Sequence, residues 1–118
     1  MTAPPAITPR ARPLLECHVG FVDDRARVVP IGEIDIDSVA LVAQRLDDVR
    51  AAGAAHVVLD LRETTFIDSC GLHLALAWQD RAERERFGFG VAPGSAAVRR
   101  AIDAAGVGSA LTFVSEAP

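Results

Sequence analysis

Three side chains that can take part in nucleophilic chemistry lie close together in the sequence: Ser69, Cys70 and His73, directly after Asp68. On a helix, residues three or four positions apart lie side by side, so the imidazole would stand next to a hydroxyl or a thiol. A hydrolase uses such a pair as base and nucleophile. The sequence has no Gly-x-Ser-x-Gly elbow and no evident oxyanion loop. Hydrolase activity is therefore only a minor alternative.

Asp68 and Ser69 are also residue types that cap helix N-termini, where a capping side chain contributes about 1 kcal/mol. The start of a helix gathers unpaired backbone N–H groups and the positive end of the helix dipole, and both favour an anion. Ser69 therefore has a second interpretation as a helix cap, and the site around it also suits an anion. The residue types alone leave both open.

The apolar pattern on either side predicts the elements that hold these residues. The run at residues 57–61 is short, β-branched and nearly continuous, which is typical of a strand buried on both faces. From Leu72 onward apolar residues recur at spacings of three and four, which predicts a helix from residue 69 or 70 to residue 84. Leu74 and Trp78 form a second apolar stripe on it, which either packs in the core, as we expect, or is exposed as a binding patch.

The rest of the chain alternates between strand and helix patterns. We expect strands at residues 14–21, 27–31, 87–91 and 111–114, one helix from Asp37 or Ser38 to Gly53, and another from residues 93–95 to Gly106. Pro30 should lie at a bulge or on an unpaired side of its strand. The alternation predicts an α/β fold with a mixed, mostly parallel sheet and crossover helices.

Length and charge limit the possible classes. The 118 residues suffice for one domain. Residues 1–13 hold four prolines and no apolar period, so we expect a disordered or extended tail before a domain at residues 14–115. A net charge of -4 without a basic stripe argues against nucleic acid as a partner. No segment approaches the roughly 20 apolar residues of a membrane span.

The run from Phe66 to Leu72, Phe-Ile-Asp-Ser-Cys-Gly-Leu, resembles a family motif. It is similar to the switch motif of the STAS domain, the sulphate-transporter and anti-sigma-factor-antagonist fold, whose usual form is Asp-Ser-Ser/Thr-Gly-Leu after a strand. Residues 32–35 match the family's Gly-Glu-apolar-Asp turn, and residues 98–107 resemble its last helix and the glycine that ends it. These motifs stand in the family's order over nearly the whole predicted domain.

The resemblance implies an anti-sigma-factor antagonist, a single STAS-like domain that acts by binding and is not an enzyme. Its unphosphorylated form would bind an anti-sigma factor with serine-kinase activity in the cytoplasm, and phosphorylation of Ser69 would end the interaction. A phosphatase is a further candidate partner. No cofactor is expected on this chain, and the oligomeric state is left open. The alternative is a STAS scaffold or ligand-sensing module without phosphoregulation.

Asp35 and Asp68 are the carboxylates that we expect beside Ser69. Asp35 follows the expected strand at residues 27–31, and Asp68 follows the strand at residues 57–61 through a loop. Strand ends of an open α/β sheet gather at one edge, and the crevice there is the usual functional location. Two carboxylates at that edge would orient the hydroxyl and then repel a phosphate on it. The other residues that we assign to this switch and partner-binding region are Cys70, Gly71, Leu72 and His73.

Two of these residues depart from the family pattern. Cys70 stands where many relatives have Ser or Thr, and we expect a small buried side chain there, although a thiol at a helix N-terminus can also serve as a redox input. His73 occupies a position that is often small, and we expect it on the surface. Cys17 is expected to be a second free thiol. His18 and His56 are too scattered to predict a metal site.

Overall fold

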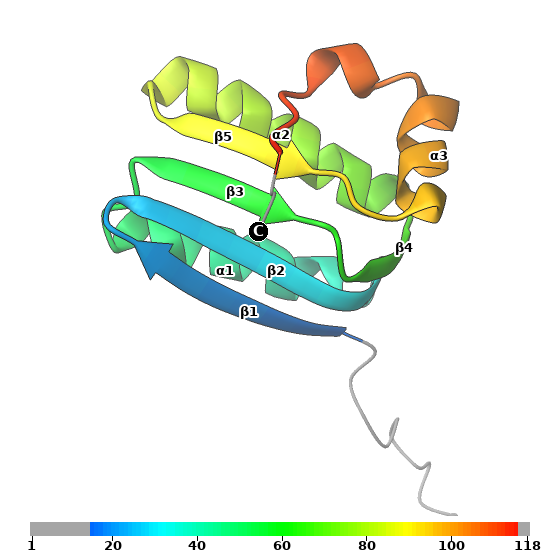
Figure 1. Ribbon diagram of the computed structural model, residues 1–118, viewed down its shortest axis with the longest axis horizontal. Coiled ribbons are helices and arrows are strands. Elements are labelled where there is room, and N and C mark those ends of the chain that lie inside the picture. Colours follow the sequence, from blue (N-terminus) through cyan, green and yellow to red (C-terminus); the bar gives the residue numbers. More distant parts are fainter. Residues whose placement is uncertain (1–14, 116–118) are drawn as a thin grey trace, which may run out of the picture.

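The computed structural model describes residues 15–115, and the tail expected at residues 1–13 lies outside the described residues. The fold is the expected α/β domain with a mixed sheet of five strands and three α-helices (Figure 1). Its elements in chain order are β1 (Leu15–Val22), β2 (Arg25–Ile34), α1 (Val39–Ala51), β3 (His56–Asp60), β4 (Thr64–Ile67), α2 (Ser69–Glu85), β5 (Gly88–Ala92), α3 (Ala96–Ala105) and the 3-10 helix Gly108–Ala110.

The sheet has the strand order β1-β2-β3-β5, with β4 paired to β2 beyond the end of β3. β1 and β2 form an antiparallel hairpin, and all other pairs are parallel. Figure 1 shows α1 and α2 against the same face of the sheet, while α3 lies beside β4. The carboxyl ends of β2 and β4 thus meet at one edge, next to the start of α2.

β2 changes its parallel partner along its length. Residues 25–28 pair with β3, whereas Gly32 and Ile34 pair with β4 across a register shift after Gly32. Pro30 falls between the two segments, where the lack of an N–H group does least damage to a parallel ladder. Its carbonyl accepts a hydrogen bond from Thr64 Oγ1 at 3.1 Å, so the side chain of Thr64 helps to join β4 to β2.

The region expected to be a loop between residues 61 and 69 contains β4. Only the first and last of its four residues, Thr64 and Ile67, are buried, so neither an apolar run nor a regular alternation marks it in the sequence. Pairing with β2 makes it a strand. The expectation that Asp68 follows β3 through a loop was therefore wrong, because Asp68 directly follows β4.

The expectation of a last strand at residues 111–114 was also wrong. Phe113 forms only an isolated bridge to Val91 of β5. The backbone N–H of Thr112 turns to α2 instead and donates to Gln79 Oε1 at 2.7 Å. A side chain of α2 thereby takes a donor that a longer strand would have used.

The core lies between the sheet and α1 and α2. Trp78 is 5% exposed and packs edge-on against Phe87, with ring centroids 5.8 Å apart. Leu74 packs against the same core. The expectation that these α2 residues belong to the core is confirmed. On α1 the buried positions are Val42, Leu46 and Val49.

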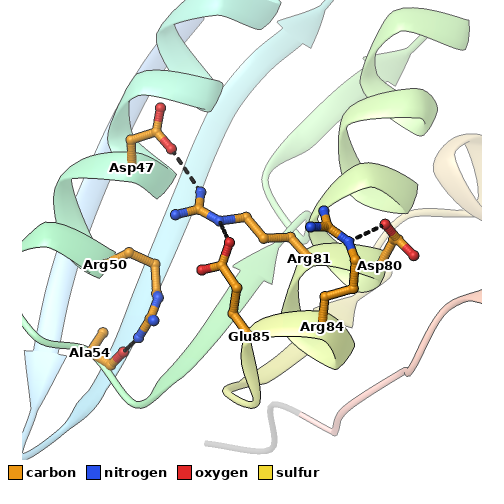
Figure 2. Close-up of polar contacts among 7 residues, drawn as sticks. All are labelled: Asp47, Arg50, Ala54, Asp80, Arg81, Arg84 and Glu85. Atoms are coloured by element: carbon orange, nitrogen blue, oxygen red, sulfur yellow. Dashed lines mark hydrogen bonds and ion pairs between the residues drawn. The ribbon is translucent and has the colours of Figure 1, made fainter.

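Charged side chains hold α1 and α2 together at the surface (Figure 2). Arg81 of α2 donates to Asp47 of α1 and to Glu85 of its own helix, both at 3.1 Å. The guanidinium lies 4.6 Å from the centre of the Trp78 ring. Exposed ion pairs add little stability singly, but here they fix a cation over the indole, which adds a cation–π contact.

Gly71 of α2 packs tightly on the strands that carry the helix. A Cβ atom there would lie 2.5 Å from Ile67 Cγ1 and 2.9 Å from Ile34 Cγ2. Both isoleucines are almost fully buried and have little room to move. The missing side chain therefore lets the first turn of α2 approach β2 and β4 closely.

Asp60 is a buried carboxylate at the end of β3, with 2% of its side chain exposed. Arg62 Nη2 lies 2.9 Å and Arg27 Nη1 3.7 Å from its Oδ2 atom. Burial by itself raises the pKa of Asp60, but the hydrogen bonds from Arg62 and the charges of both arginines outweigh it and lower the pKa below the usual value. Folding therefore favours the charged form.

We predict that Gly71→Ala lowers the free energy of unfolding by about 1–3 kcal/mol, because the added carbon overpacks the contact with Ile34 and Ile67. In an open helix the same change would raise stability by up to about 1 kcal/mol. Urea unfolding measures the difference. The control is Gly20→Ala, where a Cβ would meet nothing within 4 Å. A stabilised Gly71→Ala variant would refute the close packing.

We predict that Asp60→Asn costs about 1–3 kcal/mol at pH 7, since it removes a charged acceptor from two arginines. Because the folded pKa is lowered, the contribution of Asp60 is complete above the unfolded pKa of about 3.9 and is lost as the pH falls through the folded pKa. The wild type and the variant should converge below about pH 4. Asp80→Asn, which breaks an exposed ion pair with Arg84, should show almost no loss. A constant difference down to pH 2 would contradict the assignment.

Candidate functional site

Asp68 joins the end of β4 to the start of α2. Its Oδ1 atom accepts hydrogen bonds from the backbone N–H groups of Cys70 and Gly71, at 2.8 and 3.4 Å. Its own backbone N–H donates to the carbonyl of Ile34 on β2 at 3.1 Å, and its carbonyl accepts from Leu72. This one residue therefore caps the helix with its side chain and ties it to the sheet with its backbone.

Ser69 is the first residue of α2 and is exposed. Because the Asp68 carboxylate makes the capping hydrogen bonds, the helix does not use the Ser69 hydroxyl as its cap, and the capping interpretation of Ser69 was wrong. Within residues 15–115 no hydrogen bond engages this hydroxyl. The structure thus presents a serine hydroxyl to solvent at the positive end of a helix dipole.

Asp35 organises the neighbouring turn in a similar way. Its Oδ1 atom accepts from the backbone N–H groups of Asp37 and Ser38, at 3.0 and 3.1 Å. Ser38, the N-cap of α1, makes no capping bond with its hydroxyl, which donates to the carbonyl of Glu33 at 2.7 Å. Ser38, one of the two expected starts of this helix, is therefore its N-cap residue, but Asp35 Oδ1 and not the Ser38 hydroxyl accepts the backbone hydrogen bonds of the turn.

The fold brings Asp35 and Asp68 to the same edge of the sheet. Ile34 and Ile67, the last residues of β2 and β4, are paired across the two parallel strands. Each aspartate comes directly after its strand. The two aspartates therefore follow neighbouring strand ends at one edge of the sheet, as expected from the strand order.

The other residues assigned to the switch and partner-binding region differ in how far they are buried. Gly71 and Leu72 are buried, so they position the first turn of α2 and offer little surface to a partner. Cys70 is half-buried and His73 is exposed. No hydrogen bond joins Ser69, Cys70 and His73 side chains in the described part of the chain. The nucleophile–base pair of a hydrolase is therefore not assembled there.

Two residues that were not assigned to the switch and partner-binding region also lie at this edge. Ile36, between Asp35 and Asp37, is 70% exposed, and Phe66 of β4 is 49% exposed. The sequence signal for an exposed Phe66 was its position next to Ile67, which is buried. Neighbouring residues on a strand point to opposite faces, so Phe66 faces away from the side on which Ile67 is packed. Without β4 in the prediction, that signal could not be read.

The described residues hold no group of three His, Cys, Asp or Glu side chains that could bind a metal ion. None of the helices between residues 15 and 115 is long and apolar enough to cross a membrane. Both cysteines are free thiols, and burial raises the pKa of Cys17 to about 11, which Arg45 only partly offsets. Cys17 is thus a protonated, unreactive side chain at neutral pH.

Comparisons with solved structures place this arrangement among known proteins. An anti-sigma factor antagonist from Mycobacterium paratuberculosis is 27% identical, with a TM-score of 0.76, and the match covers 86% of this chain and 87% of the other. The anti-sigma factor antagonist SpoIIAA in its unphosphorylated form is 19% identical, with a TM-score of 0.70 and coverage of 86% and 90%. The phosphorylated form of the Bacillus cell fate determinant SpoIIAA is 16% identical, with a TM-score of 0.64 and coverage of 86% and 93%.

The sequence comparisons agree with the structural ones. No curated protein matches significantly. The family model described as "Mlab, STAS domain" matches residues 17–114, a region that includes β2, β4 and the start of α2, where the expected motifs lie. Because this match covers most of the chain, the protein belongs to the STAS domain family.

Proposed function

We propose that this chain is an anti-sigma factor antagonist controlled by phosphorylation of Ser69. In its unphosphorylated form it binds an anti-sigma factor that has serine-kinase activity, and the phosphorylated form is released. The observation that carries this proposal is the exposed Ser69 hydroxyl, freed from helix capping by Asp68. The likeness to the Mycobacterium paratuberculosis antagonist, at 27% identity over most of both chains, supports it.

A phosphate on Ser69 would meet two opposing influences. The N-terminus of α2 favours an anion by roughly 0.3–1 kcal/mol. The Cys70 and Gly71 N–H groups that would bind it, however, already donate to Asp68, whose charge repels a phosphate of about -1.5 to -2 charges. In the free domain the phosphate on Ser69 stays exposed to water. In a complex the phosphate must lose water beside Asp68, which costs several kcal/mol when it is imperfectly paired.

Asp35 and Asp68 have both structural and regulatory roles in this proposal. Each holds the backbone of a turn with one carboxylate oxygen, so the position of its charge is fixed. A fixed negative charge next to the acceptor orients the hydroxyl before phosphorylation and opposes the phosphate afterwards. Cys70, Gly71, Leu72 and His73 complete the region, the first three by packing the helix start and His73 by facing outward.

The domain acts as a binding protein in this scheme and carries no catalytic group or cofactor of its own. The nucleotide belongs to the kinase, a phosphatase restores the hydroxyl, and these exchanges take place in the cytoplasm. The SpoIIAA structures support such a cycle, because that protein has been solved with and without phosphate in a fold like this one.

A second candidate is a STAS scaffold or ligand-sensing module that is not phosphorylated. Two observations favour it. Cys70 replaces the Ser or Thr usual after the motif serine, and the family model that matches is described by the name Mlab and not as an anti-sigma factor antagonist. The two candidates differ in whether Ser69 accepts phosphate.

We predict that Ser69 is the main phosphoacceptor when the chain is incubated with its anti-sigma kinase and ATP. Ser69 is exposed at a helix start, whereas Ser38 is tied to Glu33 and Thr64 to Pro30 by hydrogen bonds. Phosphopeptide mapping identifies the site, and Ser69→Ala should abolish labelling. Thr65, which is exposed on β4, is the internal control. Modification mainly at Thr65 or elsewhere would refute the assignment.

We predict that Ser69→Ala binds the anti-sigma factor like the unmodified protein and that Ser69→Asp binds at least tenfold more weakly. The reason is the cost of burying a second carboxylate beside Asp68, and each 1.4 kcal/mol corresponds to a factor of ten. Calorimetric titration gives the two affinities, and circular dichroism checks that both variants are folded. Equal affinity of the two folded variants would exclude the charge switch and favour the scaffold.

A further inference from the structure

A cavity of about 620 Å³ lies between α3 and the last described segment of the chain. The chain leaves β5 at Pro93, forms α3 and the 3-10 helix, and returns to β5 at Phe113, which bridges Val91 (Figure 1). The residues that line the cavity come from this excursion and from its return to β5. The volume is in the range of about 300–1,000 Å³ that is usual for small-molecule sites.

The cavity lies at the carboxyl end of β5, because Pro93, which directly follows this strand, is part of its lining. β5 runs parallel to β3, which runs parallel to β2, and β4 is parallel to β2 as well. The cavity is therefore on the edge of the sheet that also carries Asp35 and Asp68. Open α/β sheets commonly bind ligands in the crevice outside the carboxyl ends of their strands.

Part of the lining is apolar, with Ile102 of α3, Phe113 and Val114 next to Pro93. The Phe113 side chain is 43% exposed, although its backbone is held by the bridge to Val91. An aromatic ring offers a large apolar contact area, and covering that area gains free energy. An apolar group of a ligand can therefore pack against this ring.

Two side chains of opposite charge, Arg99 and Asp103 of α3, line the same cavity. They are four residues apart on one helix, so they lie on the same helix face. No ion pair within residues 15–115 involves either of them. Arg99 Nε donates to the carbonyl of Gly94 at 3.0 Å. This bond fixes the guanidinium, and in the described chain no hydrogen bond engages its two terminal nitrogens.

The other cations near the cavity leave this balance of charge unchanged. Arg100 follows Arg99 on α3 but does not line the cavity. Arg62 lies close to Gly94, since a Cβ atom on that glycine would lie 2.5 Å from Arg62 Cα, but its guanidinium is bound to Asp60. The lining therefore presents one cation and one anion.

We propose that this cavity binds an apolar α-amino acid in its zwitterionic form. The Arg99 guanidinium binds the carboxylate, Asp103 accepts from the ammonium group, and the apolar side chain packs on Ile102 and Phe113. Charge-assisted hydrogen bonds of this kind are about twice as strong as neutral ones. A ligand with a single charge would be attracted by one of the two charged side chains and repelled by the other. This binding goes beyond the proposed function and does not depend on phosphorylation of Ser69.

Calorimetric titration of the full chain tests the ligand class, with L-phenylalanine as the probe. L-phenylalanine should bind at least about fivefold more tightly than 3-phenylpropionate, which lacks the ammonium group, and than phenethylamine, which lacks the carboxylate. Similar affinities for the three compounds would overturn the selection by charge. The absence of binding at about 10 mM L-phenylalanine would overturn the site itself.

Two variants test the charged residues. Arg99→Gln should weaken the binding of L-phenylalanine at least about fivefold and remove the preference over phenethylamine. Asp103→Asn should weaken it to a similar extent and remove the preference over 3-phenylpropionate. The matched control is Arg100→Gln, which removes a charge from the same helix outside the cavity and should bind within twofold of wild type. If the control binds as weakly as Arg99→Gln, the general charge of α3 and not the cavity determines binding, and the assignment is wrong.

Phe113→Ala tests the apolar contact and should also weaken the binding of L-phenylalanine at least about fivefold. Its control is Phe21→Ala in β1, which truncates a ring of similar exposure, 45% against 43%, and should bind within twofold of wild type. Melting curves check that every variant is folded. In NMR spectra L-phenylalanine should shift the amide signals of residues 99–103 and 113–115. Shifts confined to other parts of the domain would refute this location.

Discussion

The hydrogen bonds of Asp68 are the constraint on which the site depends. One carboxylate oxygen accepts hydrogen bonds from the Cys70 and Gly71 N–H groups in the first turn of α2, and the backbone N–H of the same residue donates to β2. Replacing the Asp68 side chain would remove the cap of the first turn, whereas the backbone link to the sheet would remain. Because Asp68 performs this task, Ser69 is released from it, so the structural role and the proposed regulatory role fall on two adjacent residues.

The acidic edge of the sheet is largely a product of the fold. Asp35 follows β2 and organises the turn into α1, just as Asp68 follows β4 and organises the turn into α2. Parallel neighbours place both turns at one edge. The negative charge at this edge thus comes from two carboxylates, each of which accepts hydrogen bonds from the backbone N–H groups of a turn. A partner of this edge meets charges that were already required for folding, and its own charges must match them.

Sequence patterns predicted those helices and strands whose apolar spacing and end residues are distinct within a short stretch of chain. The helix from residue 69 and the stop at Gly106 follow from apolar spacing and from a glycine with positive φ. β4 could not be predicted, because four residues with two buried positions become a strand only through pairing with β2. Asp68 and Ser69 are both good capping residues, so only geometry decides which one caps. The exposed position of Phe66 depends on the same unpredicted pairing.

The way in which β4 is attached has a consequence for motion. β3 is held between β2 and β5, whereas β4 has four residues and pairs only with β2 in the described sheet. Local opening costs less free energy where fewer contacts must break. Amide protons of β4 should therefore exchange with solvent through local opening, whereas those of β3 should exchange only when the whole domain unfolds. β4, the strand next to Ser69, is thus the part of the sheet that opens most easily. A partner bound to it would slow the exchange of its amide protons.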